Sequence, residues 1–105
     1  MTAFLTPPQM AAIRAIQHHV AGWFGTTRAE LLAHDRRPVA AIPRQIAMWL
    51  ARDETGASYP SLGAQFGRDH TTVLHGCQAV EARIEADPGF ARMVADIGRA
   101  LRRAA

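Results

Sequence analysis

The stretch Gly67–Val80 reads GRDHTTVLHGCQAV, and it combines a polar start with apolar residues at helical spacing. Its apolar residues recur at steps of four and three, as expected of a helix with one buried face; they are Val73, Cys77 and Val80. The residues just before them, Asp-His-Thr-Thr, are polar and able to donate or accept hydrogen bonds. Asp69 is a favourable N-cap, so we expect it to cap a helix that continues to about Ala86.

A shorter helix is predicted immediately before this one. Ser58 is a suitable N-cap, Pro60 fits a first turn, and Gly67 can end the helix. Leu62 and Phe66 would pack against the apolar face of the following helix. Two helices joined by a tight glycine turn and held together by apolar side chains are typical of a helix-turn-helix.

The rest of the chain predicts four further helices. Thr6 caps the first, and Thr27 with Glu30 forms a capping box for a short second helix. After a loop with a basic tip, Pro43 stands in the first turn of a third helix, and Pro88 starts the last. The residues expected to face inward on these helices and late in the 70–86 helix are Met10, Ile13, Ile16, Val20, Trp23 or Phe24, Ile46, Met48, Trp49, Leu50, Ile84, Phe90, Val94, Ile97 and Leu101.

The composition favours one all-helical domain. A chain of 105 residues, 49% hydrophobic and rich in alanine, can bury one modest core. We therefore expect residues 1–105 to form a single compact all-α domain of six helices. The net charge of +3 permits an anionic partner. One cysteine, no signal-peptide pattern and no long apolar run predict a cytoplasmic protein without a membrane span.

Enzymatic and metal chemistry receive little support from the sequence. Asp69, His70 and Thr71 are consecutive. Neighbouring side chains on a helix point in different directions, so these three do not converge on one reacting atom of a substrate. His70 and His75 are five residues apart and share no helix face well. The chain has no lysine for a phosphate-binding loop. We predict no enzyme, cofactor, metal or nucleotide site, and solvated side chains at His18, His19 and His34.

A stripe of polar residues follows the predicted 70–86 helix on the side away from its apolar face. Thr71, His75 and Gln78 are spaced by four and three, with His70 and Thr72 beside them. Such short groups suit base edges in a DNA major groove. Asp69 could accept from a cytosine amine as well as cap; the alternative, that it only caps and the threonines have no ligand, stays open here.

Two pairs of residues extend this stripe toward a DNA footprint. Arg36 and Arg37 lie in a predicted loop, where an arginine can enter a minor groove. Arg44 and Gln45 begin a helix, where backbone N–H groups and the helix dipole favour a phosphate. Double-stranded DNA is therefore the predicted partner.

The segment PRQIAMWLARDETGASYPSLGAQFGRDHTTVLHGCQAVE closely resembles the C-terminal DNA-binding domain of the bacterial replication initiator DnaA. Its GRDHTTVLH portion is the signature of that family, and the similarity extends from roughly Ala11 to Leu101. The resemblance implies major-groove reading by the residues from Asp69 to Thr72, and a minor-groove arginine at Arg36. The resulting set of predicted DNA-binding residues is Arg36, Arg37, Arg44, Gln45, Ser58, Tyr59, Pro60, Arg68, Asp69, His70, Thr71, Thr72, His75 and Gln78.

Two departures from the family pattern lie on or near the predicted DNA face. Gln78-Ala79 replaces a basic pair that is usual in the family, and Tyr59 stands where leucine is common. We expect a preferred DNA sequence that differs from the initiator's own, and fewer phosphate contacts. No ATPase segment is present in this sequence, so nucleotide switching and strand opening are not implied.

The sequence therefore predicts a stand-alone, sequence-specific DNA-binding protein, most simply a transcriptional regulator of phage or prophage type. One alternative is a replication modulator that competes with the initiator, or a fragment of a longer initiator. Another is an adaptor that docks RNA polymerase or a second regulatory protein through its first helix or its arginine-rich end, Arg99, Arg102 and Arg103.

Overall fold

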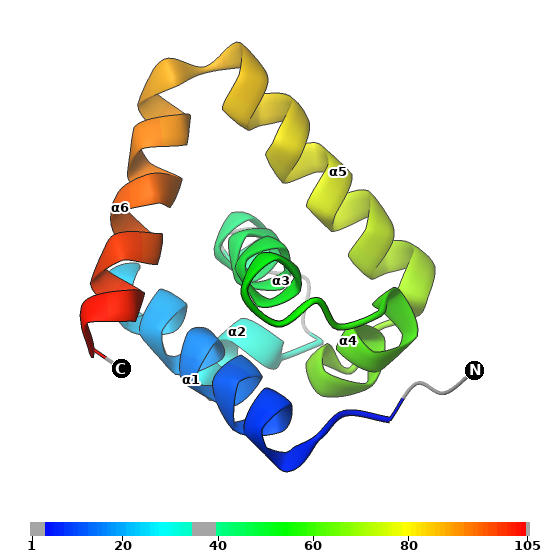
Figure 1. The fold of residues 1–105 in the computed structure, drawn as a ribbon. Coiled ribbons are helices and arrows are strands. Elements are labelled where there is room, and N and C mark those ends of the chain that lie inside the picture. The colour runs from blue at the N-terminus through cyan, green and yellow to red at the C-terminus, as the bar shows by residue number, and fades with distance from the viewer. Residues whose placement is uncertain (1–3, 35–39, 105) are drawn as a thin grey trace.

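Six helices make up the part of the chain that the computed structural model describes, residues 4–34 and 40–104. Within these residues there is no strand, so the predicted all-α class is confirmed. The helices are α1 (Pro7–Trp23), α2 (Arg28–Leu32), α3 (Ala41–Thr55), α4 (Tyr59–Phe66), α5 (His70–Ala86) and α6 (Pro88–Ala104) (Figure 1).

Three helices begin with the side-chain caps that the sequence predicts. The Thr6 hydroxyl accepts from the Gln9 N–H, and the Gln9 side chain accepts from the Thr6 N–H, which makes a full capping box. The Ser58 hydroxyl accepts from the Ser61 N–H at 3.2 Å. Thr27 caps α2 in the same way. Each cap satisfies an N–H group that has no partner inside its helix.

One prediction at a helix start is confirmed and another needs correction. Helix α3 begins at Ala41, so Pro43 is its third residue and lies in its first turn, as predicted. This position is also acceptable for proline, because N–H groups of the whole first turn lack intrahelical partners. The Thr27–Glu30 capping box is half formed: the Glu30 carboxylate accepts from the Thr27 hydroxyl at 3.3 Å rather than from the backbone N–H.

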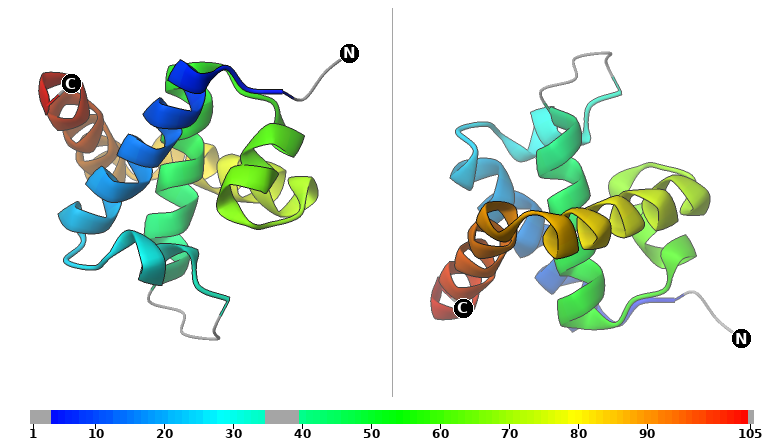
Figure 2. Two further views of the ribbon diagram at one scale, coloured as in Figure 1. Left: turned by 90° about the horizontal axis from the view of Figure 1, so that it is seen from below. Right: turned by 90° about the horizontal axis from the view of Figure 1, so that it is seen from above.

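Helix α3 lies at the centre of the fold, with α1 and α5 crossing it on opposite sides (Figure 2). Helices α5 and α6 meet at the bend before Pro88 and form two arms around α3 (Figure 1). The buried residues come from every helix and form one core. The largest fully buried side chains are Phe66, Ile13, Ile16, Leu31, Ile46, Met48, Leu50, Leu62, Ile97, Gln17, Val20 and Val73.

Most predicted core positions are buried, but the ends of α1 differ. Met10 is 42% exposed and Trp23 is 44% exposed, while Phe24 packs partly against the core. Trp49, Ile84 and Leu101 are half-buried at the edge of the core. An amphipathic pattern identifies the inward side of a helix, whereas the neighbouring elements decide how far along its length that side is covered.

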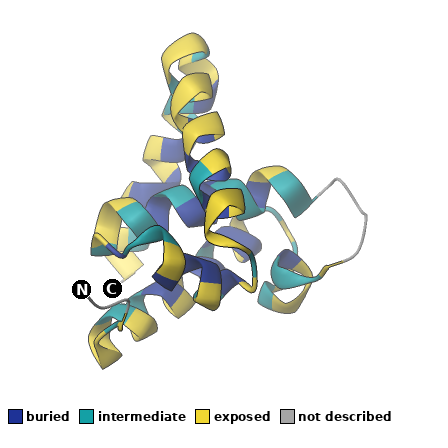
Figure 3. Cartoon of the chain, turned by 90° about the vertical axis from the view of Figure 1, so that its right-hand side faces the viewer, coloured by how far each residue is buried: buried dark blue, intermediate teal, exposed yellow. Residues whose placement is uncertain are grey.

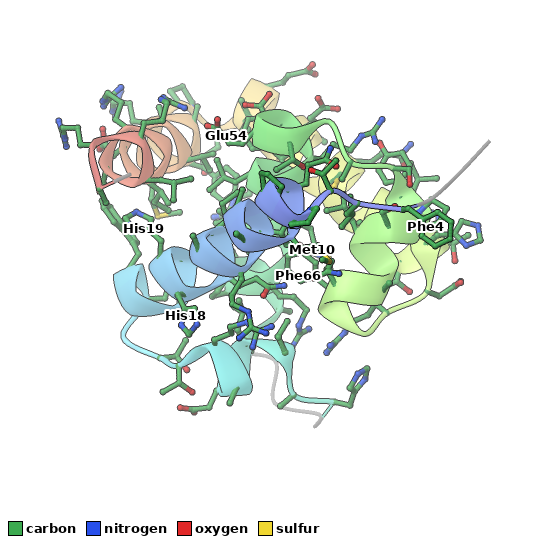
Figure 4. All side chains as sticks on the ribbon, turned by 60° about the horizontal axis from the view of Figure 1, so that its bottom comes forward. Phe4, Met10, His18, His19, Glu54 and Phe66 are labelled. Carbon is green, nitrogen blue, oxygen red and sulfur yellow. The ribbon has the colours of Figure 1, made fainter. Side chains whose placement is uncertain are left out.

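The histidine pair on α1 is divided between two environments. His18 is exposed, as predicted, whereas His19 is half-buried and its Nε2 atom has no solvent contact and no hydrogen-bond partner. Figure 4 shows the two rings leaving α1 in different directions, with His19 turned toward α6. The prediction that His19 is solvated is therefore wrong, because α6 returns across this side of α1.

Helix α4 and the first residues of α5 approach each other closely at the turn that joins them. Gly67 takes the left-handed conformation (φ +65°) and ends α4, and the Arg68 N–H donates to the Gly63 carbonyl at 2.9 Å. A Cβ atom on Gly63 would lie only 2.5 Å from the Arg68 carbonyl oxygen. Gly63 therefore allows α4 to pack directly against the start of α5.

Cys77 belongs to the core of this helix pair, with 5% of its surface exposed. Burial raises the pKa of the Cys77 thiol to about 11, from the ordinary 9.0. We expect slow alkylation by iodoacetamide at pH 8 in the native protein and rapid alkylation in denaturant, because the thiolate is the nucleophile. Because the unfolded chain loses this proton first, the thiol's contribution to the free energy of unfolding should decline between pH 9 and 11. Cys77→Ala should remove that decline. Rapid alkylation of the native protein would contradict the burial of the Cys77 thiol.

Candidate nucleic-acid interface

The outer face of α5 carries the polar stripe that the sequence predicts. Thr71, His75 and Gln78 are all exposed, and so are His70 and Thr72 beside them. The opposite side of the helix is buried through Val73, Cys77 and Val80. Figure 3 views the molecule from the side of α5 and shows exposed residues along this helix. The stripe therefore faces solvent, on a helix whose opposite face is packed in the core.

The stripe changes character in the second half of α5. The next residues at the same spacing after Gln78 are Ala82 and Glu85, and both are exposed. A methyl group offers little to a DNA backbone, and a carboxylate repels phosphate. Only the first turns of α5 are thus suited to an anionic duplex, and Gln78 lies near the limit.

Asp69 occupies the N-cap position of α5, but its side chain makes no cap hydrogen bond to the backbone. This corrects the predicted cap. The carboxylate instead accepts from the Thr71 hydroxyl through Oδ2, and its Oδ1 lies 3.2 Å from His70 Nδ1. The Thr71 hydroxyl lowers the pKa of the Asp69 carboxyl, and the His70 imidazole acts in the same direction. Three stripe side chains are thereby joined at the helix N-terminus.

The ionised carboxylate restricts what can face this end of α5. Asp69 is exposed, so it would meet the ligand directly. A phosphate would be repelled by it, whereas a base amine such as cytosine N4 can donate to it. The tip of α5 is therefore better suited to base edges than to the DNA backbone.

The start of α3 lies next to the middle of α5. Arg44 and Gln45 are half-buried, and Arg44 Nε donates to the Leu31 carbonyl at 2.8 Å. A Cβ atom on Gly76 of α5 would lie 3.3 Å from Gln45 Cγ, so the stem of Gln45 packs against the helix there. The fold thus brings two predicted contact residues from α3 beside the stripe, although they are far from it in sequence.

The predicted contact residues at the start of α4 have mixed surroundings. The Ser58 hydroxyl is engaged in capping and bonds the Ser61 hydroxyl at 3.0 Å. The Arg52 guanidinium lies 4.0 Å from the centre of the Tyr59 ring, and Pro60 is exposed. Of these three residues, Pro60 is exposed, the Tyr59 ring is covered on one face by Arg52, and the Ser58 hydroxyl is used within the chain.

The Arg68 guanidinium donates to three backbone carbonyls, whereas the Arg44 Nε bond described above reaches one. Arg68 donates to the carbonyl oxygens of Leu32 and Ala33, each at 2.8 Å, and of Phe66 at 3.0 Å. Burial and the nearby Arg44 lower the pKa of Arg68. The remaining predicted residues, Arg36 and Arg37, lie outside the described residues.

Comparison with known proteins assigns this chain to a family. The sequence model of the family described as "Bacterial dnaA protein helix-turn-helix" matches residues 13–80, which include α4, the turn and the whole polar stripe. The chain belongs to the bacterial DnaA helix-turn-helix family. A helix-turn-helix of the DnaA type implies DNA binding.

Several relatives are full-length initiators. The chain is 40% identical over 88 residues to the chromosomal replication initiator protein DnaA of Symbiobacterium thermophilum, covering 83% of this chain and 19% of that protein. It is 44% identical over 81 residues to the DnaA of Rhizobium meliloti, covering 76% of this chain and 17% of the relative. For the DnaA of Treponema denticola the identity is 39% over 93 residues, with 88% and 20% covered. The chain thus spans about a fifth of the length of these relatives.

Other features of this DnaA-type domain were outside the reach of sequence reasoning. Gly63 and Gly76 let helices approach α5 closely, and neither stands at a turn that would have signalled its role. Gln17 is buried on α1, where it donates to the Gln65 carbonyl at 3.1 Å and accepts from Arg28 Nε at 2.7 Å. A polar residue at a core position of α1 was the one available signal.

The arginine-rich end of α6 is partly engaged within the chain. Arg102 donates to Glu54 of α3 at 2.6 Å, and Arg99 pairs with Asp96. No helix among the described residues has the length and apolar content to cross a bilayer. Those residues also contain no group of three or more His, Cys, Asp and Glu placed to share a metal ion.

Proposed function

We propose that this protein binds double-stranded DNA in a sequence-specific manner by inserting the N-terminal half of α5 into the major groove. The observation that supports this most is the exposed polar stripe of α5 on a DnaA-type helix-turn-helix. Base edges would be read by the residues of this stripe, which are Asp69, His70, Thr71, Thr72, His75 and Gln78. A stripe of hydrogen-bonding groups that contains no arginine or lysine suits discrimination between bases better than simple attraction to phosphate charge.

The remaining predicted contacts would hold the backbone on either side of the groove. Arg44 and Gln45 lie at the start of α3, where N–H groups and a cation favour phosphate. Ser58, Tyr59 and Pro60 at the start of α4 would lie near phosphates or bases. Arg36 would enter the adjacent minor groove, as the resemblance implies, with Arg37 beside it in the same predicted basic loop.

Selection of bound duplexes from a random pool tests this proposal directly. The purified chain should enrich a defined sequence, and fluorescence anisotropy at physiological ionic strength should then separate that duplex from a scrambled one. Specific sites are typically bound about 10³-fold or more tightly than random DNA. Equal affinity for the selected and scrambled duplexes would remove the proposed function.

Arg44→Ala should weaken binding to every duplex, whatever its sequence. Because a phosphate contact releases counterions, the slope of log Kd against log salt concentration should fall by about one unit. Arg14→Ala on the exposed face of α1 is the matched control and should leave the slope unchanged. A wild-type slope for Arg44→Ala would remove this residue from the phosphate contacts.

We propose that the DNA-bound protein regulates transcription, with competition for initiator boxes as the second candidate. The uncharged Gln78-Ala79 pair at the end of the stripe favours a recognition sequence distinct from the initiator's. The identity of 39–44% to initiators favours the second role. Genome-wide occupancy distinguishes them, since a regulator should occupy promoters, with RNA polymerase as a partner, and a competitor should occupy origin boxes.

A further inference from the structure

We propose that Arg68 is a positioning residue that orients the recognition helix α5, and that the selectivity for one DNA sequence depends on it without a contact between its guanidinium and DNA. This inference rests on the proposed function, and it replaces the direct DNA contact implied by including Arg68 among the predicted DNA-binding residues.

The contacts of Arg68 join three helices at one point. Its Nη1 donates to the Leu32 and Phe66 carbonyls, and its Nη2 donates to the Ala33 carbonyl. Leu32 and Ala33 form the end of α2, and Phe66 is the last residue of α4. Arg68 immediately precedes Asp69, the N-cap of α5. The guanidinium therefore connects the ends of α2 and α4 at the base of the recognition helix.

The chemistry of the acceptors explains why an arginine is required there. Carbonyls at a helix C-terminus have no partner inside the helix and carry the negative end of its dipole. A planar guanidinium reaches several such oxygens at once, whereas an ammonium is a compact point charge. Arg44 takes the adjacent Leu31 carbonyl, so two arginines bind three consecutive carbonyls at the C-terminal end of α2.

The same contacts oppose a second role for this guanidinium at a phosphate. Both hydrogens of Nη1 are used by carbonyls, and His34 Nε2 lies 3.4 Å from the same nitrogen. Turning the group toward a DNA backbone would break bonds to three half-buried carbonyls, each of which would need a new partner. Three of the five guanidinium N–H groups are thus already used to hold the chain.

The consequence for recognition follows from the position of the anchor. The stripe starts one residue after Arg68, and its first three side chains are already joined through the Asp69 carboxylate. Hydrogen bonds to base edges require donor and acceptor within about 0.5 Å of their proper separation. A small change in the direction of α5 would therefore affect base contacts much more than the general attraction to DNA.

Two variants test this, Arg68→Lys and Arg68→Gln, with Arg14→Ala as the control for loss of an exposed charge. Kd is measured for the selected and scrambled duplexes over a range of salt, at a temperature where circular dichroism shows each variant folded. We expect both Arg68 variants to lose roughly tenfold or more of the selected-to-scrambled affinity ratio, with the wild-type salt slope.

Two other results would overturn the inference. If Arg68→Lys behaves as wild type while Arg68→Gln lowers the slope by about one unit on both duplexes, Arg68 contacts a phosphate. If both variants unfold at lower denaturant but keep the wild-type affinity ratio when folded, Arg68 serves stability alone. A wild-type protein that prefers no duplex would instead overturn the proposed function, and that outcome is read from the unmutated chain.

Discussion

Gly63→Ala should cost the domain roughly 3 kcal/mol of unfolding free energy, at the upper end for added volume in a packed interior. The new Cβ atom would lie 2.5 Å from the Arg68 carbonyl oxygen and 3.3 Å from the His70 nitrogen. Both neighbours are backbone atoms, so no side-chain rotation relieves the overlap. Helices α4 and α5 must move apart, and the hydrogen bond from the Arg68 N–H to the Gly63 carbonyl weakens with them.

The matched control for this substitution is Gly22→Ala on α1. A Cβ atom there would meet nothing within 4 Å, and alanine favours a helix over glycine by roughly 0.5–1 kcal/mol. The control should therefore be slightly stabilised. Urea denaturation compares the two, with an unchanged m-value as the test that only stability changed. A Gly63→Ala variant as stable as wild type would show that the close approach of α4 to α5 is not required.

His70→Ala should weaken binding to the selected duplex by about 2 kcal/mol, or roughly 30-fold, while binding to scrambled DNA changes little. The imidazole is exposed at the tip of α5, and its Nδ1 is held 3.2 Å from the Asp69 carboxylate. This contact with Asp69 orients the imidazole ring and leaves Nε2 for a hydrogen bond to one base edge. Because the side chain is exposed, stability should be nearly unchanged.

His18→Ala provides the control for removing an exposed histidine elsewhere. His18 lies on α1 and points away from the core (Figure 4). Its removal should leave both affinities at the wild-type values. Fluorescence anisotropy with the two duplexes measures the difference, and equal losses on both duplexes for His70→Ala would mean that this residue does not read bases.

Much of the fold follows from interactions between residues close in sequence. The caps at Thr6 and Ser58 bond to residues three positions away, so short motifs are enough to predict them. The buried side of α5 follows from the spacing of its apolar residues, because the helical period places them on one face. The polar stripe was predictable for the same reason, as the face left over.

Contacts between distant segments were not predictable in this way. Arg68 resembles any exposed arginine in sequence, yet its carbonyl acceptors at Leu32 and Ala33 are 36 and 35 residues away. Asp69 is a residue type that favours an N-cap, but its carboxylate accepts from the Thr71 hydroxyl and makes no cap hydrogen bond to the backbone. His19 is covered by α6, which approaches from the other end of the chain.

The approximate positions of the helices, the apolar side of each, and the polar groups at the start of α5 can all be predicted from the amino-acid sequence. These properties depend on local backbone preferences and on the helical period, both of which act over a few residues. Which polar groups face a ligand and which hold the fold together is known only from the folded structure, as at Arg68 and Gln17. The reason is that a donor's role is set by the acceptor it meets, and chain topology alone brings those two together.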